Sequence, residues 1–311
     1  MSITQVASQI IIIFLLMLLG ALIRESGFLH PQSISDITNI ALYFLSPMVI
    51  LKAFQQDFSL QKFQIFIKLV LAVFLGYLVT IILAKIIFHK VQDDNLKSIL
   101  LYGSIYSNNG FMGVPLAQAL FGNFGVFYSV ASLIGFNVMS WTQGVSMFKQ
   151  SDQQLSYLEK IKKIILNPNI LAIIAGLIVF IFSIKLPTIV SSFLNYGSQA
   201  FTPISMIVIG SNLVGIKLKD VKLTGPLTIA LLLRNFIFPL INLFILWLLG
   251  IRGVPMVTTV LLASCPAAGL VVLFTLQAKG NTKPAVILMS VSTILSLITI
   301  PCIYFCTTWF R

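Results

Sequence analysis

A long apolar segment of this chain is interrupted by Gly103-Ser-Ile-Tyr-Ser-Asn-Asn-Gly-Phe-Met-Gly-Val-Pro115, and a later one by Ala263-Ser-Cys-Pro-Ala-Ala-Gly269. An interruption leaves backbone N–H and C=O groups without helical partners, which lipid tolerates only where protein or a wet cavity surrounds them. Paired interruptions in the two halves of a membrane protein are typical of the binding site of a secondary transporter. The two stretches therefore predict both a fold and a site.

The composition places the whole chain in a membrane. Of its 311 residues, 58% are hydrophobic and 9% are charged, whereas a soluble domain has about 25% charged residues. Apolar runs of about 20 residues recur from end to end. The formal net charge of +12 does not indicate a nucleic-acid partner, because the cations lie in short loops between apolar runs. We therefore expect an all-α polytopic protein whose main partner is the lipid bilayer.

Ten transmembrane helices are predicted, and the loops between them are short. Lysine and arginine gather in alternate loops, so the positive-inside rule places the loop at 149–166 in the cytoplasm and both termini outside a plasma (inner) membrane. The predicted spans are approximately 5–23, 32–54, 63–88, 97–120, 124–148, 167–184, 189–215, 223–250, 255–278 and 283–309.

The two halves resemble inverted copies of one another. Ser46-Pro47 corresponds to Thr202-Pro203, and Gly122-Asn123 corresponds to Gly280-Asn281. Each copy has five spans, an odd number, so the second copy enters the membrane upside down. The predicted organisation is a first repeat at 1–148, a linker at 149–166 and a second repeat at 167–311.

The chemistry of the interruptions favours an anion. A helix N-terminus carries about half a positive charge and free N–H groups, and inversion brings two broken helices together as a crossing pair at the membrane centre. Asparagine donates to carboxylates, glycine allows close backbone approach, and proline stops the helical ladder. The candidate substrate-binding residues are Asn108, Asn109, Gly110, Gly113, Pro115, Asn137, Gln143, Arg234, Cys265, Pro266 and Ala267.

The sequence leaves two questions about the site open. A one-residue slip rotates a helix by about 100°, so the sequence does not decide whether Asn108 or Asn109 faces the ligand. Arg234 lies deep in span 8, where a cation is costly and usually functional, and no Asp or Glu lies at a comparable depth. It either meets a substrate carboxylate, or binds orphan carbonyls at the C-terminus of a broken helix, or snorkels through a shifted span.

The sequence lacks the sets of residues that other classes of protein require. The sequence contains no phosphate-binding loop, no buried carboxylate pair, no Ser/His/Asp set and no metal-ligand cluster. We therefore expect neither an enzyme nor a cofactor nor a metal site, and transport would be secondary.

The segment Ser107-Asn-Asn-Gly-Phe-Met-Gly-Val-Pro115, with the later Cys265-Pro-Ala-Ala268, resembles the auxin efflux carrier family. That family includes plant auxin carriers and bacterial malate and malonate permeases. The resemblance implies an elevator fold like that of bile acid transporters, with a scaffold of spans 1, 2, 6 and 7. It also implies a moving domain of spans 3–5 and 8–10, and a homodimer formed through the scaffold.

The same resemblance narrows the substrate. Asn108 or Asn109 matches the family's first-crossover asparagine, but Cys265-Pro266-Ala267 stands where plant carriers pair an asparagine with proline. A permease for small organic anions, such as malate or a related dicarboxylate, therefore fits better than a carrier of an auxin-like carboxylate. The alternatives are a sodium-coupled symporter of the bile acid type and a channel or sensor that does not transport.

Overall fold

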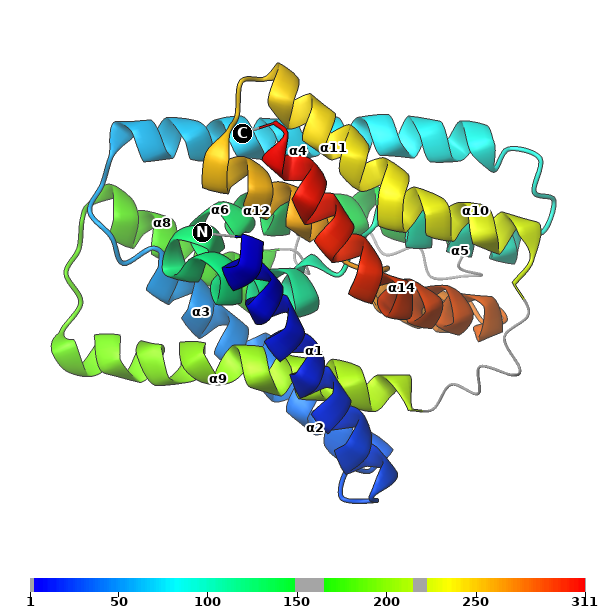
Figure 1. Ribbon diagram of the computed structural model, residues 1–311, viewed down its shortest axis with the longest axis horizontal. Helices are drawn as coiled ribbons and strands as arrows, with labels where there is room; N and C mark the ends of the chain where they lie inside the picture. The colour runs from blue at the N-terminus through cyan, green and yellow to red at the C-terminus, as the bar shows by residue number, and fades with distance from the viewer. Residues whose placement is uncertain (1–2, 149–164, 215–222, 311) are drawn as a thin grey trace. The chain divides into compact units, whose positions relative to one another are not determined.

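The computed structural model describes residues 3–148, 165–214 and 223–310. Within these ranges the regular elements are helices, and the structure contains no strand beyond one isolated bridge. The predicted linker at 149–166 lies outside the described residues, apart from Ile165 and Leu166. The expectation of an all-α protein is therefore confirmed for the described part of the chain (Figure 1).

The chain forms two compact units, each assembled from separate stretches of sequence. The first unit consists of Met1–Phe66, Gly110–Val130 and Ile165–Leu218, and the second of Ile67–Asn109, Ala131–Ile164 and Lys219–Arg311. The first unit contains α1 (Ile3–Glu25), α2 (Pro31–Ile40), η1 (Ala41–Leu45), α3 (Ser46–Ala53), α8 (Pro168–Ile181) and α9 (Thr188–Leu213). Three elements have residues in both units, namely α4 (Leu60–Ile87), η2 (Asn109–Gly113) and α6 (Val114–Met139).

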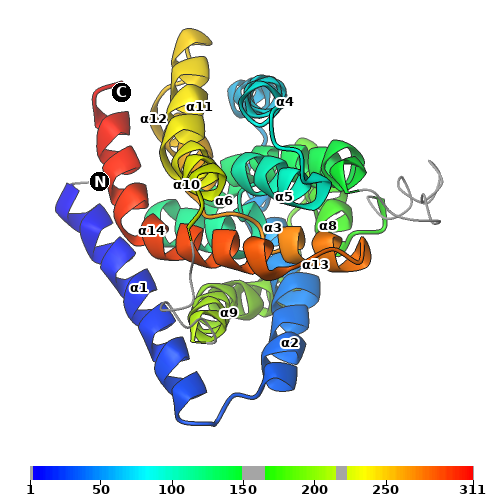
Figure 2. The same ribbon diagram turned by 90° about the vertical axis from the view of Figure 1, so that its right-hand side faces the viewer.

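The second unit contains most of the remaining helices. Besides the larger part of α4, they are α5 (Asp94–Ile105), η3 (Ser140–Gly144), η4 (Val145–Met147), α10 (Gly225–Leu232), η6 (Leu233–Ile237), α11 (Phe238–Leu248), α12 (Gly253–Ser264), α13 (Leu270–Gln277) and α14 (Lys283–Thr308). Of these, α5 packs against α13 and α14 (Figure 2). Asp93 begins α5 by accepting a hydrogen bond from the Leu96 N–H at 3.0 Å, as an N-cap residue does.

The first unit is stabilised by a close helix crossing. Helix α1 packs across α9, where Gly20 and Gly210 leave room for the facing backbone. The Ser211 hydroxyl of α9 donates to the Gly20 carbonyl at 2.9 Å. Small residues at such crossings are typical of membrane helices, because association in lipid depends on close packing rather than on the hydrophobic effect.

Six helices in the described residues are long and apolar enough to cross a membrane. They are Ser8–Glu25, Pro31–Ala53, Leu60–Ile87, Asn109–Met147, Gly225–Leu248 and Lys283–Thr308. The fourth is bent at Gly122, whose φ of 58° and ψ of −150° are accessible in practice only to glycine. This bend falls where the sequence predicts the boundary between spans 4 and 5, while the total of ten spans stays a prediction.

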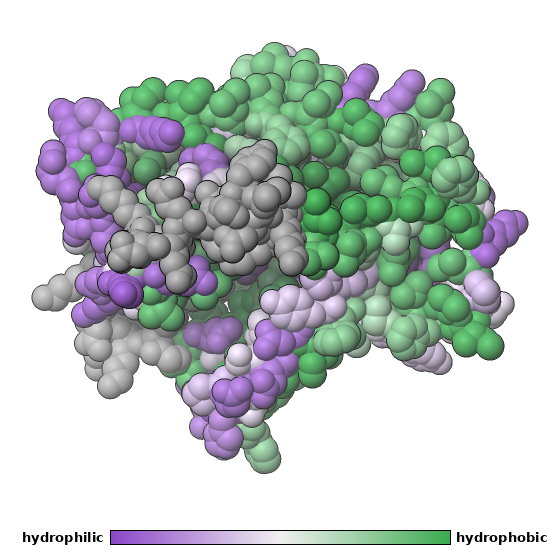
Figure 3. Space-filling model, turned by 180° about the vertical axis from the view of Figure 1, so that it is seen from behind, coloured by the Kyte–Doolittle hydropathy of each residue, from purple (hydrophilic) through white to green (hydrophobic). Residues whose placement is uncertain are grey.

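The outward side chains of these helices suit lipid. Along α4, Leu71, Leu78, Ile82 and Ile86 are all exposed, and they recur at intervals of four or seven residues on one side of the helix. Hydrophobic residues also cover much of the face seen in Figure 3. Apolar exposure on this scale indicates a surface that faces a bilayer, so the protein is a multi-pass membrane protein.

Candidate functional site: the meeting of the two interrupted helices

The second interruption follows directly from its proline. Helix α12 ends at Ser264, and Cys265 is extended, with a φ of −61° and a ψ of 152°. A residue before proline avoids the helical region for steric reasons, and Pro266 has no N–H with which to continue the ladder. Helix α13 then begins at Leu270. Since α12 has 12 residues, or about 18 Å at 1.5 Å per residue, it cannot cross a bilayer core of about 30 Å alone.

The first interruption contains no proline where the helix stops. Helix α5 ends at Ile105, and Tyr106 is extended, with a φ of −97° and a ψ of 112°. The Tyr106 ring packs on Tyr102 and Tyr77 at centroid distances of 4.6 and 5.4 Å. Its hydroxyl donates to the Met139 carbonyl at 3.0 Å and also to the Gln143 side-chain oxygen. These contacts fix the point at which the chain leaves the helix.

The two interruptions pair with each other as an antiparallel bridge between Ser107 and Ala267. The Asn108 N–H donates to the Pro266 carbonyl at 2.8 Å, and the Ala268 N–H donates to the Tyr106 carbonyl at 3.0 Å. Backbone groups that the broken helices leave unpaired therefore satisfy one another, as a low-dielectric interior requires. The prediction that the interrupted segments meet is confirmed by this pairing.

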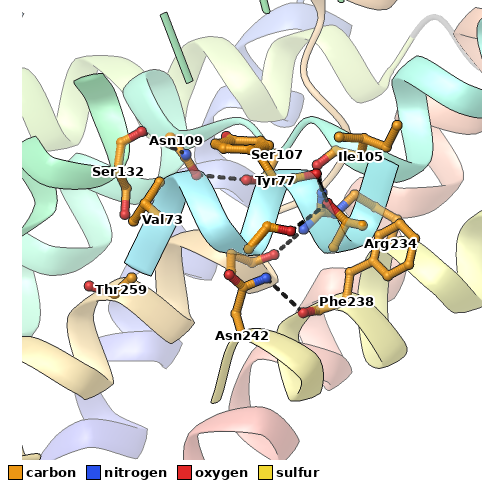
Figure 4. A pocket seen from close by; sticks show the side chains of 13 residues that line it. Val73, Tyr77, Ile105, Ser107, Asn109, Ser132, Arg234, Phe238, Asn242 and Thr259 are labelled. Carbon is orange, nitrogen blue, oxygen red and sulfur yellow. Dashed lines mark hydrogen bonds between the residues drawn. The ribbon is translucent and has the colours of Figure 1, made fainter. Parts of the chain in front are cut away.

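Arg234 fastens the ends of the two half-helices. It lies in the π-helical turn η6 and is 2% exposed. One guanidinium nitrogen, Nη1, donates to the carbonyls of Ser104 and Ile105 at 3.1 and 2.7 Å, and Nη2 donates to the carbonyl of Ala263. These carbonyls belong to the last turns of α5 and α12, where helical donors run out. Figure 4 shows the side chain reaching this point.

This geometry answers the question that the sequence left open about Arg234. Of the three alternatives, the observed contacts are those with orphan carbonyls at broken-helix C-termini. The Nε atom is buried and has no hydrogen-bond partner among the described residues, so one donor of this side chain stays uncommitted.

A second polar network, absent from the sequence prediction, holds the other side of the bridge. The Ala267 N–H donates to the Ser292 hydroxyl at 3.1 Å, and that hydroxyl donates to Asn235 Oδ1 at 2.8 Å. Asn235 Nδ2 in turn donates to the Ser292 carbonyl at 2.9 Å. Asn235 follows Arg234 in η6, and π-helical turns often occur at functional sites. An asparagine beside a deep arginine was the available signal.

A small cavity of about 30 Å³ lies beside the bridge. Its polar lining includes Ser107, Asn109, Ser132, Arg234 and Thr259 (Figure 4). Asn109 accepts from the Ser107 hydroxyl at 2.7 Å and donates to the Ser132 carbonyl at 3.5 Å. Asn109 is thus the asparagine whose side chain reaches the cavity, while Asn108 contributes its backbone N–H to the bridge.

The other predicted site residues fall in different places. Gln143 accepts from Tyr106 beside the first interruption, and Cys265 is buried in the second. Asn137 donates to the Leu133 carbonyl of its own helix at 2.8 Å. Gly110, Gly113 and Pro115 follow Asn109 in sequence but belong to the first unit. Pro115 lies in the first turn of α6, where a missing N–H is tolerated, so it accompanies the start of a helix and not the end of one.

A larger cavity of about 510 Å³ lies elsewhere in the second unit. Its lining includes the cations Lys85 and Lys97, the anion Asp94 and the amides of Asn95 and Gln143. Gln143 also lines it and contacts Tyr106, which connects the wall of this cavity with the first interruption. No cluster of three or more metal-ligating side chains occurs in the ranges that the structure describes.

Two relatives with the same general role align over most of this chain. An uncharacterized transporter of Methanocaldococcus jannaschii is 26% identical over 269 residues, which cover 83% of this chain and 85% of the relative. An uncharacterized transporter of Methanothermobacter thermautotrophicus is 26% identical over 291 residues, which cover 93% of this chain and 94% of the relative. Both are similar to this chain along nearly its whole length.

Family membership follows from a match of similar extent. The sequence model for the family described as "Membrane transport protein" matches residues 5–304. This range includes both interruptions, Arg234 and the helices that carry them. The chain therefore belongs to this membrane transport protein family, the auxin efflux carrier-like family that its first interrupted segment resembles.

Proposed function

We propose that the protein is a secondary carrier of small organic anions, and that the meeting of the two interrupted helices is its substrate site. The observation that carries this proposal is the charge balance at the bridge. The C-terminal ends of α5 and α12 contribute about half a negative charge each, and the single positive charge of Arg234 offsets them. The N-terminal end of α13, which follows the second interruption, then leaves a net positive potential.

A positive potential in a low-dielectric interior favours an anion. The amide of Asn109 and the backbone N–H groups beyond the interruptions are donors suited to a carboxylate. A dicarboxylate such as malate exceeds the cavity of about 30 Å³, which has room for one or two waters. The proposal therefore requires the cavity to widen when substrate enters, as alternating access demands.

The mechanism proposed is an elevator within ten spans arranged as two inverted repeats. The scaffold would comprise spans 1, 2, 6 and 7, and the moving domain spans 3–5 and 8–10, with a homodimer formed through the scaffold. The division of the contacts into two units supports this assignment, with the difference that residues 110–130 group with the first unit. The proposed setting is the plasma (inner) membrane, with the termini outside.

The cavity of about 510 Å³ supplies a proposed entrance. Lys85 and Lys97 in its lining lie near the end of α4 and the start of α5, on either side of a loop that is predicted to be cytoplasmic. Two cations near a mouth of this size raise the local concentration of anions. Gln143 and Tyr106 then lead from the entrance to the first interruption.

Uptake into proteoliposomes tests the proposal directly. Labelled malate, malonate, succinate and indole-3-acetate are offered separately to the purified, reconstituted protein. We expect saturable uptake of at least one dicarboxylate and little uptake of indole-3-acetate. Single-channel currents would contradict a carrier, and uptake of indole-3-acetate alone would contradict the proposed substrate class.

Asn109→Ala is expected to lower kcat/KM for the transported anion by about 10- to 100-fold, since a buried amide that orients a charged ligand contributes about 1.5–3 kcal/mol. The exposed Asn39 provides the matched control, and Asn39→Ala should leave uptake unchanged. Asn108→Ala should cost less than Asn109→Ala, because Asn108 pairs through its backbone N–H. Equal uptake by wild type and Asn109→Ala would remove Asn109 from the site.

A further inference from the structure

We propose that Arg234 is the resident cation of the helix crossing, standing where a transporter coupled to sodium would bind its ion, so that this carrier works without a metal cation there. This inference rests on the proposed function and concerns how the same site is balanced electrically. In transporters with broken helices, the C-terminal ends of half-helices and unwound carbonyls are the groups that coordinate a coupling cation. In this chain those groups already have a partner.

The contacts of Arg234 match that role. Its guanidinium donates to carbonyls from two different helix ends, Ser104 and Ile105 of α5 and Ala263 of α12. A buried cation needs a counter-charge, yet the described residues that line the cavity of Arg234 and Asn109 include no carboxylate. The two helix C-termini, at about half a negative charge each, supply it.

The side-chain oxygen atoms that hold the bridge are already engaged in hydrogen bonds. Asn109 Oδ1 accepts from Ser107, and the Ser292 hydroxyl is occupied by Ala267 and Asn235. A sodium ion in the cavity would also lie beside the guanidinium, since Arg234 is part of the cavity wall. Neighbouring like charges repel strongly in a low-dielectric interior. The charge of Arg234 therefore disfavours a metal cation at the bridge and favours an anion.

Thermal unfolding of the detergent-purified protein tests the assignment without any transport assay. We expect the Tm of wild type to be unchanged when sodium is replaced by N-methylglucamine at constant ionic strength. Arg234→Ala should lower the Tm by about 6–15 °C, because it leaves helix C-termini buried without a counter-charge. Guanidinium chloride at about 20 mM should then raise the Tm of Arg234→Ala by several degrees, because the ion fills the vacated position, as a bound ligand stabilises the native state.

Arg252→Ala is the matched control. Arg252 also donates to backbone carbonyls, those of Trp247 and Ile251, but its side chain is exposed. Guanidinium should not raise the Tm of Arg252→Ala or of wild type, and urea at the same concentration should not raise that of Arg234→Ala. A sodium-specific rise in the wild-type Tm, or the same response to guanidinium in Arg234→Ala and Arg252→Ala, would overturn the inference.

If Arg234→Ala yields no folded protein, Arg234→Lys and Arg234→Gln replace it. Both side chains retain reach, but only lysine retains the charge, so the lysine variant should have the higher Tm; equal values would overturn the inference. Uptake separates the two proposals. Absence of anion transport together with the expected Tm values would reject the proposed function and keep Arg234 as the resident cation. Saturable anion uptake that depends on sodium at the bridge would instead support the proposed function and reject that role of Arg234.

Discussion

Replacing Gly210 with alanine is expected to lower the Tm of the purified protein by about 5–10 °C, which corresponds to overpacking by up to about 3 kcal/mol. A Cβ atom at Gly210 would overlap the backbone carbonyl of Met17 in α1. On the facing helix, a Cβ at Gly20 would overlap the backbone of Ile207. Because both obstacles are backbone atoms, no rotamer change relieves the clash, and α1 must move away from α9.

That movement also breaks a polar contact. The Ser211 hydroxyl reaches the Gly20 carbonyl at 2.9 Å only because the helices touch, and lipid offers that hydroxyl no replacement acceptor except its own helix. The matched control is Gly225→Ala, because an added Cβ at Gly225 meets no atom within 4 Å. The two variants should be compared by thermal unfolding in one detergent. The same Tm for both would mean that the helices are not in the close contact described.

The position of the second helix interruption could be predicted from the sequence because its cause is local. Pro266 excludes the helical region for Cys265 and removes a donor, and these effects act within two residues. The membrane-spanning helices could be predicted for a similar reason, because the thickness of a bilayer sets the length of each apolar run. The bend at Gly122 also has a local signal, because a glycine there separates two apolar runs.

The partners of the site residues could not be predicted, because they lie far apart in the sequence. Arg234 binds carbonyls that precede it by about 130 residues, and a carbonyl carries no signature in a sequence since every residue has one. A deep arginine therefore suggested a substrate carboxylate and an orphan carbonyl equally. The choice between Asn108 and Asn109 was open for a different reason, namely that it depends on the rotation of the chain after Tyr106.

Asn235→Leu is expected to reduce uptake by about 100-fold and to lower the Tm as well. Asn235 is fully buried, and its amide accepts from the Ser292 hydroxyl while donating to the Ser292 carbonyl. Leucine has a similar size but neither function, so the Ser292 hydroxyl loses its acceptor and the Ala267 N–H loses an oriented partner. An unsatisfied buried polar group costs about 1–3 kcal/mol. Here the cost falls on the segment at Ala267, which forms one side of the bridge and would shift.

A double-mutant cycle separates this positioning role from ordinary packing. Ser292→Ala alone should reduce uptake by about 10-fold, and Ser292→Ala combined with Asn235→Leu should be hardly worse than Asn235→Leu alone, because both changes remove one network. The matched control is Ser290→Ala, since the Ser290 hydroxyl is buried on the same helix without a hydrogen-bond partner. That variant should keep the uptake and Tm of wild type.

If the network positions the bridge, the Asn235 and Ser292 variants should not lose uptake and Tm in the same proportion. Asn235→Gln retains both hydrogen-bonding functions on a longer side chain, so we expect it to recover most of the Tm while KM for the anion stays raised, since the bridge is displaced. Additive losses for Asn235→Leu and Ser292→Ala, with KM unchanged throughout, would instead mean that the two residues stabilise α14 independently. The bridge would then depend for its position on Arg234 and its own two backbone hydrogen bonds.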